Sequence, residues 1–143
     1  MTPAYTPKHF VLQEYLPRQL YEQLEHDGLL WKGWLLLDER LLRTDDALRE
    51  RFGKLTINDW HLGGTRNESG LRLPGMATFK PTSQHSFGRA SDKISPTLSG
   101  DDMRRYVLQH RDEFPLMTAM EKDVGWLHSD VRNCPPIQLV SPT

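Results

Sequence analysis

The chain has 143 residues, and its 18 basic and 19 acidic side chains leave a formal net charge of −1 at pH 7. This length fits one domain with a single modest core. The near-neutral charge argues against a dedicated nucleic-acid-binding protein, which would carry a strongly basic face. One cysteine excludes an internal disulfide and suits a reducing compartment.

No apolar stretch of the sequence approaches the roughly 20 residues that a membrane-spanning helix needs. The apolar segment at residues 31–37 (WKGWLLL) is short and ends at Asp38, so we expect it to be buried in the core. The first ten residues show no basic region followed by an apolar one, so no secretory signal is visible. We therefore expect a monomer that is synthesised in the cytoplasm.

Two helices are predicted in the N-terminal part of the chain. Residues 17–26 are predicted to form the first, because two leucines lie four residues apart and an Asp-Gly stop signal follows. The second lies within residues 37–52, where apolar residues recur at helical spacing. Thr44 or Asp45 is the candidate cap for its start, and Gly53 is placed to end it.

Residues 55–57 are then expected to form a strand. The stretch at residues 69–86 is rich in Gly, Pro, Ser and Thr, and we predict a long loop there. Long loops in a compact domain are usually functional. This loop carries Arg72 and His85.

A helix is predicted from Ser99, its N-cap, to about Arg111, because apolar residues follow at helical spacing. Residues 116–120 and 125–132 are predicted to pair as antiparallel strands. Side chains alternate between the faces of a strand. The face of the second strand that is expected to line a cleft carries Trp126, His128, Asp130 and Arg132.

These elements predict an α+β fold, with helices packed on one side of a small antiparallel sheet. We expect a single domain over residues 1–143. It has a helical part at 1–53, a core with the functional site at 54–132, and a C-terminal tail at 133–143.

Two histidines and an aspartate form a candidate metal site. His85 and Asp92 are seven residues apart, and His128 follows on a predicted strand. A catalytic zinc ion has three protein ligands and an open position, whereas a structural zinc ion has four, usually including cysteines. Since Cys134 is the single cysteine, a thiolate-rich structural site is excluded. We therefore expect a metal that takes part in chemistry.

The same residues resemble a known family. The signature Ser-x-His-x-x-Gly-x-Ala-x-Asp of the zinc D-Ala-D-Ala peptidases is matched by Ser83, His85, Gly88, Ala90 and Asp92. Trp126-x-His128 is similar to the family strand that carries the third ligand, and residues 69–72 (SGLR) resemble its Ser-Gly-Tyr-Arg segment. The chain thus resembles the lysostaphin/D-Ala-D-Ala-peptidase/hedgehog superfamily, most closely its short phage and prophage members.

The resemblance implies a zinc peptidase that cuts peptidoglycan stem peptides, as a carboxypeptidase or as an L-Ala–D-Glu endopeptidase. It implies that Arg72 helps to bind substrate and to stabilise the developing oxyanion. Without a visible signal, such an enzyme is expected to reach the cell wall after lysis or by delivery with a phage particle.

Hydrolysis also needs a base, for which a positioned carboxylate is suited. Glu121 is the first candidate, because strand pairing can bring it beside His128, and Asp123 and Asp130 are its rivals. Dipeptidase-like members of the family carry a glutamate where Gly125 stands here, and other members carry a second histidine where Asp130 stands. As a second role, Asp130 is expected to accept a hydrogen bond from a ligand imidazole and to fix its tautomer.

The remaining polar residues allow alternative roles. Ser83 either binds substrate or braces the loop beside the first ligand, and Trp126 either lines a peptide groove or packs on the sheet. His110 is expected on the apolar face of its helix as a core residue with a satisfied ring, and Arg104 and Arg105 on a solvated face.

Two other functions stay open at this stage. The first is a catalytically inactive metal-binding module of a phage particle that binds cell-wall peptides. The second is a metal-dependent nuclease, which the neutral net charge and the lack of a basic stripe disfavour.

Overall fold

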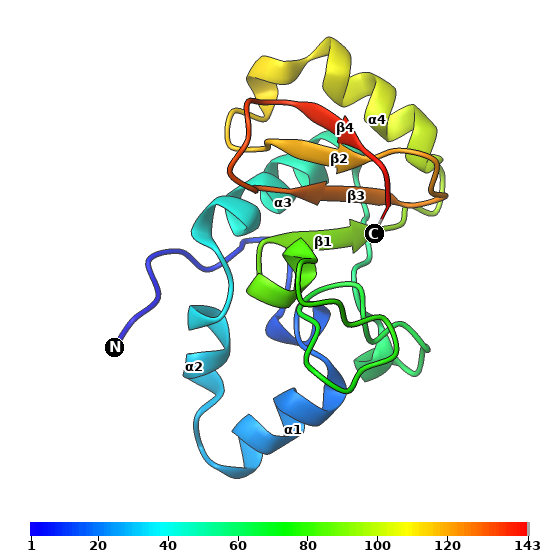
Figure 1. Ribbon diagram of the computed structural model, residues 1–143. Helices are drawn as coiled ribbons and strands as arrows, with labels where there is room; N and C mark the ends of the chain where they lie inside the picture. The colour runs from blue at the N-terminus through cyan, green and yellow to red at the C-terminus, as the bar shows by residue number, and fades with distance from the viewer. Residues whose placement is uncertain (143) are drawn as a thin grey trace.

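The computed structural model describes residues 1–142 and shows the expected α+β fold, with four α-helices and one small four-stranded sheet in this part of the chain (Figure 1). The helices are α1 (Arg18–His26), α2 (Leu30–Leu35), α3 (Glu39–Phe52) and α4 (Gly100–Gln109). The strands are β1 (Ala90–Lys93), β2 (Ala119–Glu121), β3 (Leu127–Asp130) and β4 (Gln138–Val140). Over residues 1–142, none of the helices has the length and apolar character needed to cross a membrane.

The strands are ordered β1-β3-β2-β4 across the sheet. β3 runs antiparallel to both β1 and β2, as expected for the β2–β3 pair, and the register places Asp92 opposite His128. β4 runs parallel to β2. The sheet therefore differs at this edge from the antiparallel expectation, because part of the segment interpreted as a tail, residues 133–143, supplies a strand.

β1 lies in a segment where the sequence indicates no strand. All four of its residues are buried, although Ser91, Asp92 and Lys93 are polar. They are buried because β1 pairs with β3 and is covered by α3, whose Asp45 contacts Lys93. The strand expected at residues 55–57 is reduced to one isolated bridge to the residue that follows β1.

Two predicted helices are confirmed. The helix predicted for residues 17–26 is α1, which begins directly after Pro17. Ser99 caps α4, and its side chain accepts a hydrogen bond from the backbone N–H of Asp102 at 3.0 Å. The last residue of α4 is Gln109, close to its predicted end.

α3 begins earlier than predicted. Its N-cap is Asp38, whose carboxylate accepts the backbone N–H of Arg40 at 2.9 Å. Thr44 and Asp45, the predicted caps, instead lie buried inside the helix. Gly53 ends the helix with φ of 76°, as predicted, because glycine adopts this conformation without a steric penalty.

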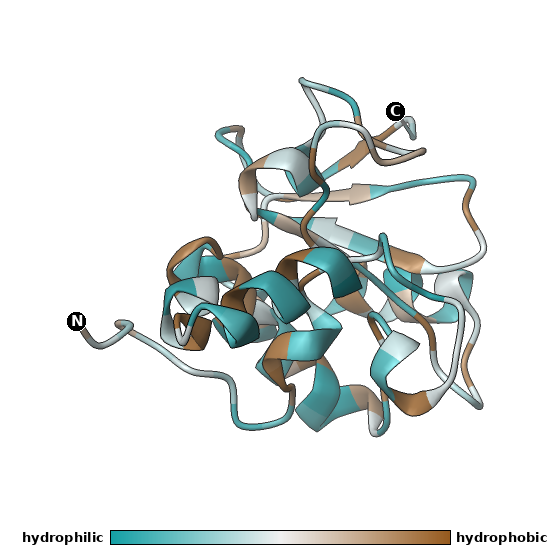
Figure 2. Cartoon of the chain, turned by 90° about the horizontal axis from the view of Figure 1, so that it is seen from below, coloured by the Kyte–Doolittle hydropathy of each residue, from teal (hydrophilic) through white to brown (hydrophobic). Residues whose placement is uncertain are grey.

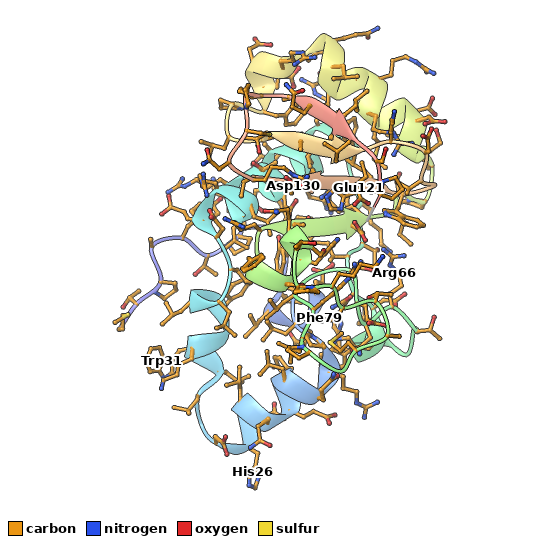
Figure 3. All side chains as sticks on the ribbon, in the orientation of Figure 1. His26, Trp31, Arg66, Phe79, Glu121 and Asp130 are labelled. Carbon is orange, nitrogen blue, oxygen red and sulfur yellow. The ribbon has the colours of Figure 1, made fainter. Side chains whose placement is uncertain are left out.

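The apolar segment at residues 31–37 is only partly buried, which corrects the core assignment. Trp31, Leu35 and Leu36 are 40%, 41% and 45% exposed, and Trp31 points away from the body of the protein (Figure 3). The physical reason is that α2 is a helix of six residues on the surface, and it buries a single face around Gly33. Hydrophilic and apolar stretches alternate along the helices in the same way (Figure 2).

The helical part and the sheet share one core. In the view of Figure 1, α3 lies behind the sheet and α4 runs along the top of it above β4, whereas α1 and α2 lie beyond its β1 edge. One cluster of buried hydrophobic side chains runs from Phe10 and Tyr15 to Val131 and Ile137. Residues before and after position 53 therefore stabilise each other.

Candidate metal centre

The three predicted ligands come together in the structure. One ligand atom from each of His85, Asp92 and His128 lies within 4.8 Å of the others, and all three residues are buried. The Oδ1 atom of Asp92 is 3.2 Å from Nε2 of His85 and 2.9 Å from Nδ1 of His128. Two imidazoles and one carboxylate that converge in this way could hold a metal ion.

Each ligand comes from a different element. Asp92 lies on β1 and His128 lies opposite it on β3. His85 lies in a 3-10 turn, Gln84–Phe87, which begins where the Ser83 side chain accepts the backbone N–H of His85 at 3.3 Å. Ser83 therefore braces the loop. Gly88 ends the turn with φ of 68°, and a Cβ there would collide with the backbone of Leu36.

Hydrogen bonds orient both histidine rings. Nδ1 of His85 lies 2.8 Å from the backbone oxygen of Gly70, which can only accept, so this nitrogen carries the hydrogen and Nε2 faces Asp92. Nε2 of His128 lies 2.8 Å from Oδ2 of Asp130, and Nδ1 faces Asp92. Metal-binding histidines have such an oxygen partner on the second ring nitrogen. The donor set therefore fits a bound metal, and the predicted hydrogen bond to Asp130 is confirmed.

The charges at the centre favour a cation. Burial lowers the pKa of His128, but its hydrogen bonds to Asp130 and Asp92 outweigh this effect and raise the pKa to about 9. Burial raises the pKa of Asp92, but the two nearby imidazoles hold it well below its usual range. The carboxylate is thus ionised inside the protein and needs a positive neighbour. A metal ion would take the place of the proton between His128 and Asp92, because a ligand imidazole must release it.

Asp130 and Arg132 form a pair behind the site. Arg132 donates two hydrogen bonds to Asp130, from Nε at 2.8 Å and from Nη2 at 2.6 Å. Burial raises the pKa of Asp130, but the hydrogen bonds from Arg132 and His128 lower it to about 2. The carboxylate is therefore held ionised on the side of His128 away from Asp92.

Glu121 stands beside the metal centre at the end of β2. It is 7% exposed, and its Oε1 lies 3.6 Å from Nδ1 of His128, the nitrogen that faces Asp92. Figure 3 shows Glu121 and Asp130 close to each other on the sheet. Asp123, one rival for the base, is exposed in the turn that follows β2. The other rival, Asp130, is occupied by Arg132 and by the opposite side of the imidazole.

Arg72 is also brought to the centre. Its Nη2 lies 3.1 Å from Oδ2 of Asp92, and its Nε donates to the backbone oxygen of Glu68 at 2.7 Å. The side chain is 14% exposed. The long loop therefore positions a guanidinium on the carboxylate oxygen that the two histidines leave free.

An open pocket adjoins Asp92 and Arg72. Trp126, which is 38% exposed, forms part of its wall, which is one of the two roles left open for it by the sequence. Arg66 lines the pocket too, and its Nη2 donates to the backbone oxygen of Asp92 at 3.2 Å (Figure 3). The rest of the lining is Thr65, Asn67, Glu68, Ser69 and Thr78. The sequence offered no signal for Arg66, because an isolated arginine in a loop is usually a surface charge.

A buried polar cluster lies on the opposite side of the ligand strands. Lys93 is fully buried, and its Nζ lies 3.1 Å from Oδ1 of Asp45. Nζ also donates to the hydroxyls of Ser91 at 2.6 Å and Ser129 at 2.8 Å. Ser91 and Lys93 flank Asp92 in the sequence, and Ser129 follows His128. Their contacts with one another and with Asp45 connect both β1 and β3 to α3.

The two arginines of α4 have different environments, which corrects one expectation. Arg105 is exposed, as predicted. Arg104 is buried, with 6% exposure, and contacts the turn between β2 and β3. His110 is half-buried, its ring stacks on Tyr106 at 4.0 Å, and its Nδ1 donates to the backbone oxygen of Tyr106. The expected hydrogen bond of the His110 ring is therefore confirmed, but its expected place in the core is wrong, because α4 ends at Gln109 and His110 follows it as the C-cap.

Comparison of the chain with protein-family models, with curated proteins and with solved structures finds no match. The geometry of the centre and the motif resemblance therefore carry the functional argument. Of these two, the geometry is independent of any relative.

Proposed function

We propose that the protein is a zinc-dependent peptidase that hydrolyses the stem peptides of bacterial peptidoglycan. The observation that carries this proposal is the buried convergence of His85, Asp92 and His128, with the carboxylate of Glu121 beside it. The peptide substrate follows from the motif resemblance, and the open pocket beside Asp92 supplies room for a chain.

Zinc is the metal that suits this donor set, because catalytic zinc sites combine three nitrogen or oxygen ligands with one open position. His85 would bind through Nε2, His128 through Nδ1 and Asp92 through Oδ1. The bound ion would polarise the scissile carbonyl and make water acidic enough to be deprotonated near neutral pH.

Glu121 is the general base of the proposed reaction. Its buried carboxylate lies beside the metal-facing nitrogen of His128, so Oε1 can accept a proton from the attacking water. The same oxygen can then deliver that proton to the leaving amine. Asp130 stays ionised and keeps the His128 ring in orientation.

Arg72 supplies positive charge at the pocket wall. Its contact with Asp92 fixes the guanidinium next to the centre. A fixed cation stabilises the negative charge that develops on the carbonyl oxygen, and no reorganisation is needed during the reaction. The indole of Trp126 provides an apolar wall against which a peptide can pack.

Purified peptidoglycan tests the proposal directly. Zinc-loaded protein is expected to release free D-Ala or shortened stem peptides, identified by mass spectrometry, and a chelator is expected to stop the release. Glu121→Gln should retain zinc and fold but lose about 10²- to 10⁴-fold in turnover, as for a missing general base.

Asp123→Asn is the matched control, because it removes an exposed carboxylate from the adjacent turn. It is expected to retain wild-type turnover. Intact stem peptides after long exposure to the zinc-loaded protein would contradict the peptidase proposal and favour a wall-binding module without activity. Full activity in Glu121→Gln would contradict its role as the base.

A further inference from the structure

Arg104 makes an unusual set of contacts with the turn between β2 and β3, residues 122–126. Its Nη1 donates to the backbone oxygen of Trp126 at 2.7 Å and lies 3.4 Å from that of Glu121. Its Nη2 donates to the backbone oxygen of Val124 at 2.8 Å. One guanidinium therefore contacts three carbonyls that bracket the turn from end to end.

The same guanidinium is anchored to its own helix. Nη2 also lies 2.5 Å from Oδ1 of Asp101, one turn earlier on α4. A buried cation is costly unless its donors are satisfied, and here a carboxylate and three carbonyls satisfy them. An arginine presents five N–H donors in a rigid fork, whereas a lysine presents three donors from one point. The geometry thus requires an arginine.

A second observation shows that α4 and the turn are packed backbone to backbone. A Cβ on Gly100 would come within 2.6 Å of the backbone oxygen of Trp126 and 2.9 Å of that of Gly125. Gly100 is the first residue of α4. The absence of a side chain there lets the first turn of the helix reach the β2–β3 turn, where Arg104 then binds it.

Glu121 and Trp126, two residues of the proposed machinery, lie at the two ends of the turn, whereas residues 122–126 include none of the candidate metal ligands. Glu121 is the last residue of β2, directly before the turn, and Trp126 is the last residue of the turn. His85 and Asp92 lie on other elements, and His128 lies on β3, two residues after Trp126. The metal centre and the clamped turn are therefore separate parts of the site. A defect in the turn should displace the base and the pocket wall while the ligands stay in place.

We propose that Arg104 is the positioning residue of this site. It locks the β2–β3 turn onto α4 and so holds the carboxylate of Glu121 beside the metal centre and the indole of Trp126 on the pocket wall. The catalytic part of this inference rests on the proposed peptidase function, whereas the locking of the turn does not.

Arg104→Met tests whether the Arg104 side chain holds the β2–β3 turn against α4, and Arg105→Met is the matched control. Arg105 is the next residue of the same helix, and it makes a comparable contact with Asp102, but its side chain is 67% exposed. In hydrogen exchange followed by mass spectrometry, peptides that cover residues 121–127 should exchange at least about tenfold faster in Arg104→Met, because local opening becomes easier. Arg105→Met should exchange like the wild type.

Two further readouts separate positioning from a general loss of structure. Zinc affinity, measured by chelator competition, should stay within about threefold of the wild type in Arg104→Met, because the ligands lie outside the turn. The kcat of the zinc-loaded variant should fall about 10- to 100-fold, and Arg104→Lys should not rescue it. In a Glu121→Gln background, the same Arg104→Met change should lower kcat by a smaller factor than in the wild type, because only the part that acts through Trp126 then remains.

If residues 121–127 exchange hydrogen at the wild-type rate in Arg104→Met, then Arg104 does not hold the β2–β3 turn against α4. This outcome is decisive whether or not the protein is a peptidase. If the two substitutions reduce kcat additively in the double variant, Arg104 does not act by positioning Glu121. Full activity in Arg104→Lys would show that the two-pronged guanidinium is not needed for this role. If the wild type leaves stem peptides intact, the proposed function fails and the exchange experiment alone decides the clamp.

Discussion

Asp92 and His128 are direct partners across the β1–β3 pair, and Oδ1 of Asp92 lies 2.9 Å from Nδ1 of His128. Side chains of directly opposite residues on antiparallel strands point to the same face and meet. Strand pairing thus assembles two thirds of the candidate metal centre from residues 36 positions apart in the chain. His85 completes it from the 3-10 turn that precedes β1.

Metal analysis should find about one zinc ion per chain in protein purified without chelator. His85→Ala or His128→Ala should weaken zinc binding at least about 100-fold. Removing a metal ligand should reduce the affinity more than removing a residue that only hydrogen-bonds to a ligand, which costs about 10- to 100-fold. His26→Ala is the control, since His26 is exposed at the end of α1 and points away from the site (Figure 3). Undiminished zinc content in both ligand variants would refute the assignment.

Asp130→Asn should lower zinc affinity about 10- to 100-fold without preventing the fold. The asparagine amide has the same size, but it lacks the charge that holds Arg132 and supports the His128 imidazole. Chelator competition measures this loss. An affinity equal to that of the wild type would show that the pair with Arg132 has no influence on the centre.

Lys93→Met should reduce the free energy of unfolding by about 3–5 kcal/mol, because the variant leaves Asp45 buried without its cation. The double variant Asp45→Leu/Lys93→Met should recover a large part of this loss, since both charges are then absent. Urea unfolding at pH 7 measures both values. A neutral effect of Lys93→Met alone would mean that the buried ion pair contributes nothing to stability.

Lowering the pH should remove the contribution that the Asp38 carboxylate, at the start of α3, makes to the free energy of unfolding. The Arg40 side chain, which donates to this carboxylate, holds its pKa below the usual value despite the opposing effect of partial burial. A carboxyl whose pKa is lower in the folded than in the unfolded state stabilises the fold above the unfolded value, about 3.9, and this is lost as the pH falls through the folded value.

The difference in unfolding free energy between wild type and Asp38→Asn should therefore be present at pH 7 and vanish in strong acid. Because the ion pair lies at the surface, with the Arg40 side chain 49% exposed, we expect no more than about 1 kcal/mol. Urea titrations at pH 7, 4 and 2.5 provide the comparison. A difference that grows towards low pH would contradict the sign of the pKa shift.

Local signals in the sequence were sufficient to predict several elements and the candidate metal ligands. Ser99 and the apolar spacing after it predicted α4, because capping and helical periodicity act within a few residues. The motif spacing pointed to His85, Asp92 and His128, which the fold brings together. The alternation in β3 also placed Asp130 beside a ligand ring.

The tertiary structure alone decided the features whose partners lie far away in the chain. β1 is polar and shows no strand pattern, and it becomes a strand because β3 pairs with it and α3 covers it. Lys93 is buried because Asp45, 48 positions away, can meet it. Arg104 is buried because its guanidinium donates hydrogen bonds to backbone carbonyls 17 to 22 positions later in the chain. A charged side chain can be buried where a partner distant in the sequence offsets the cost of its desolvation. The sequence near the charged residue does not show which distant residue is that partner, so the burial cannot be predicted locally.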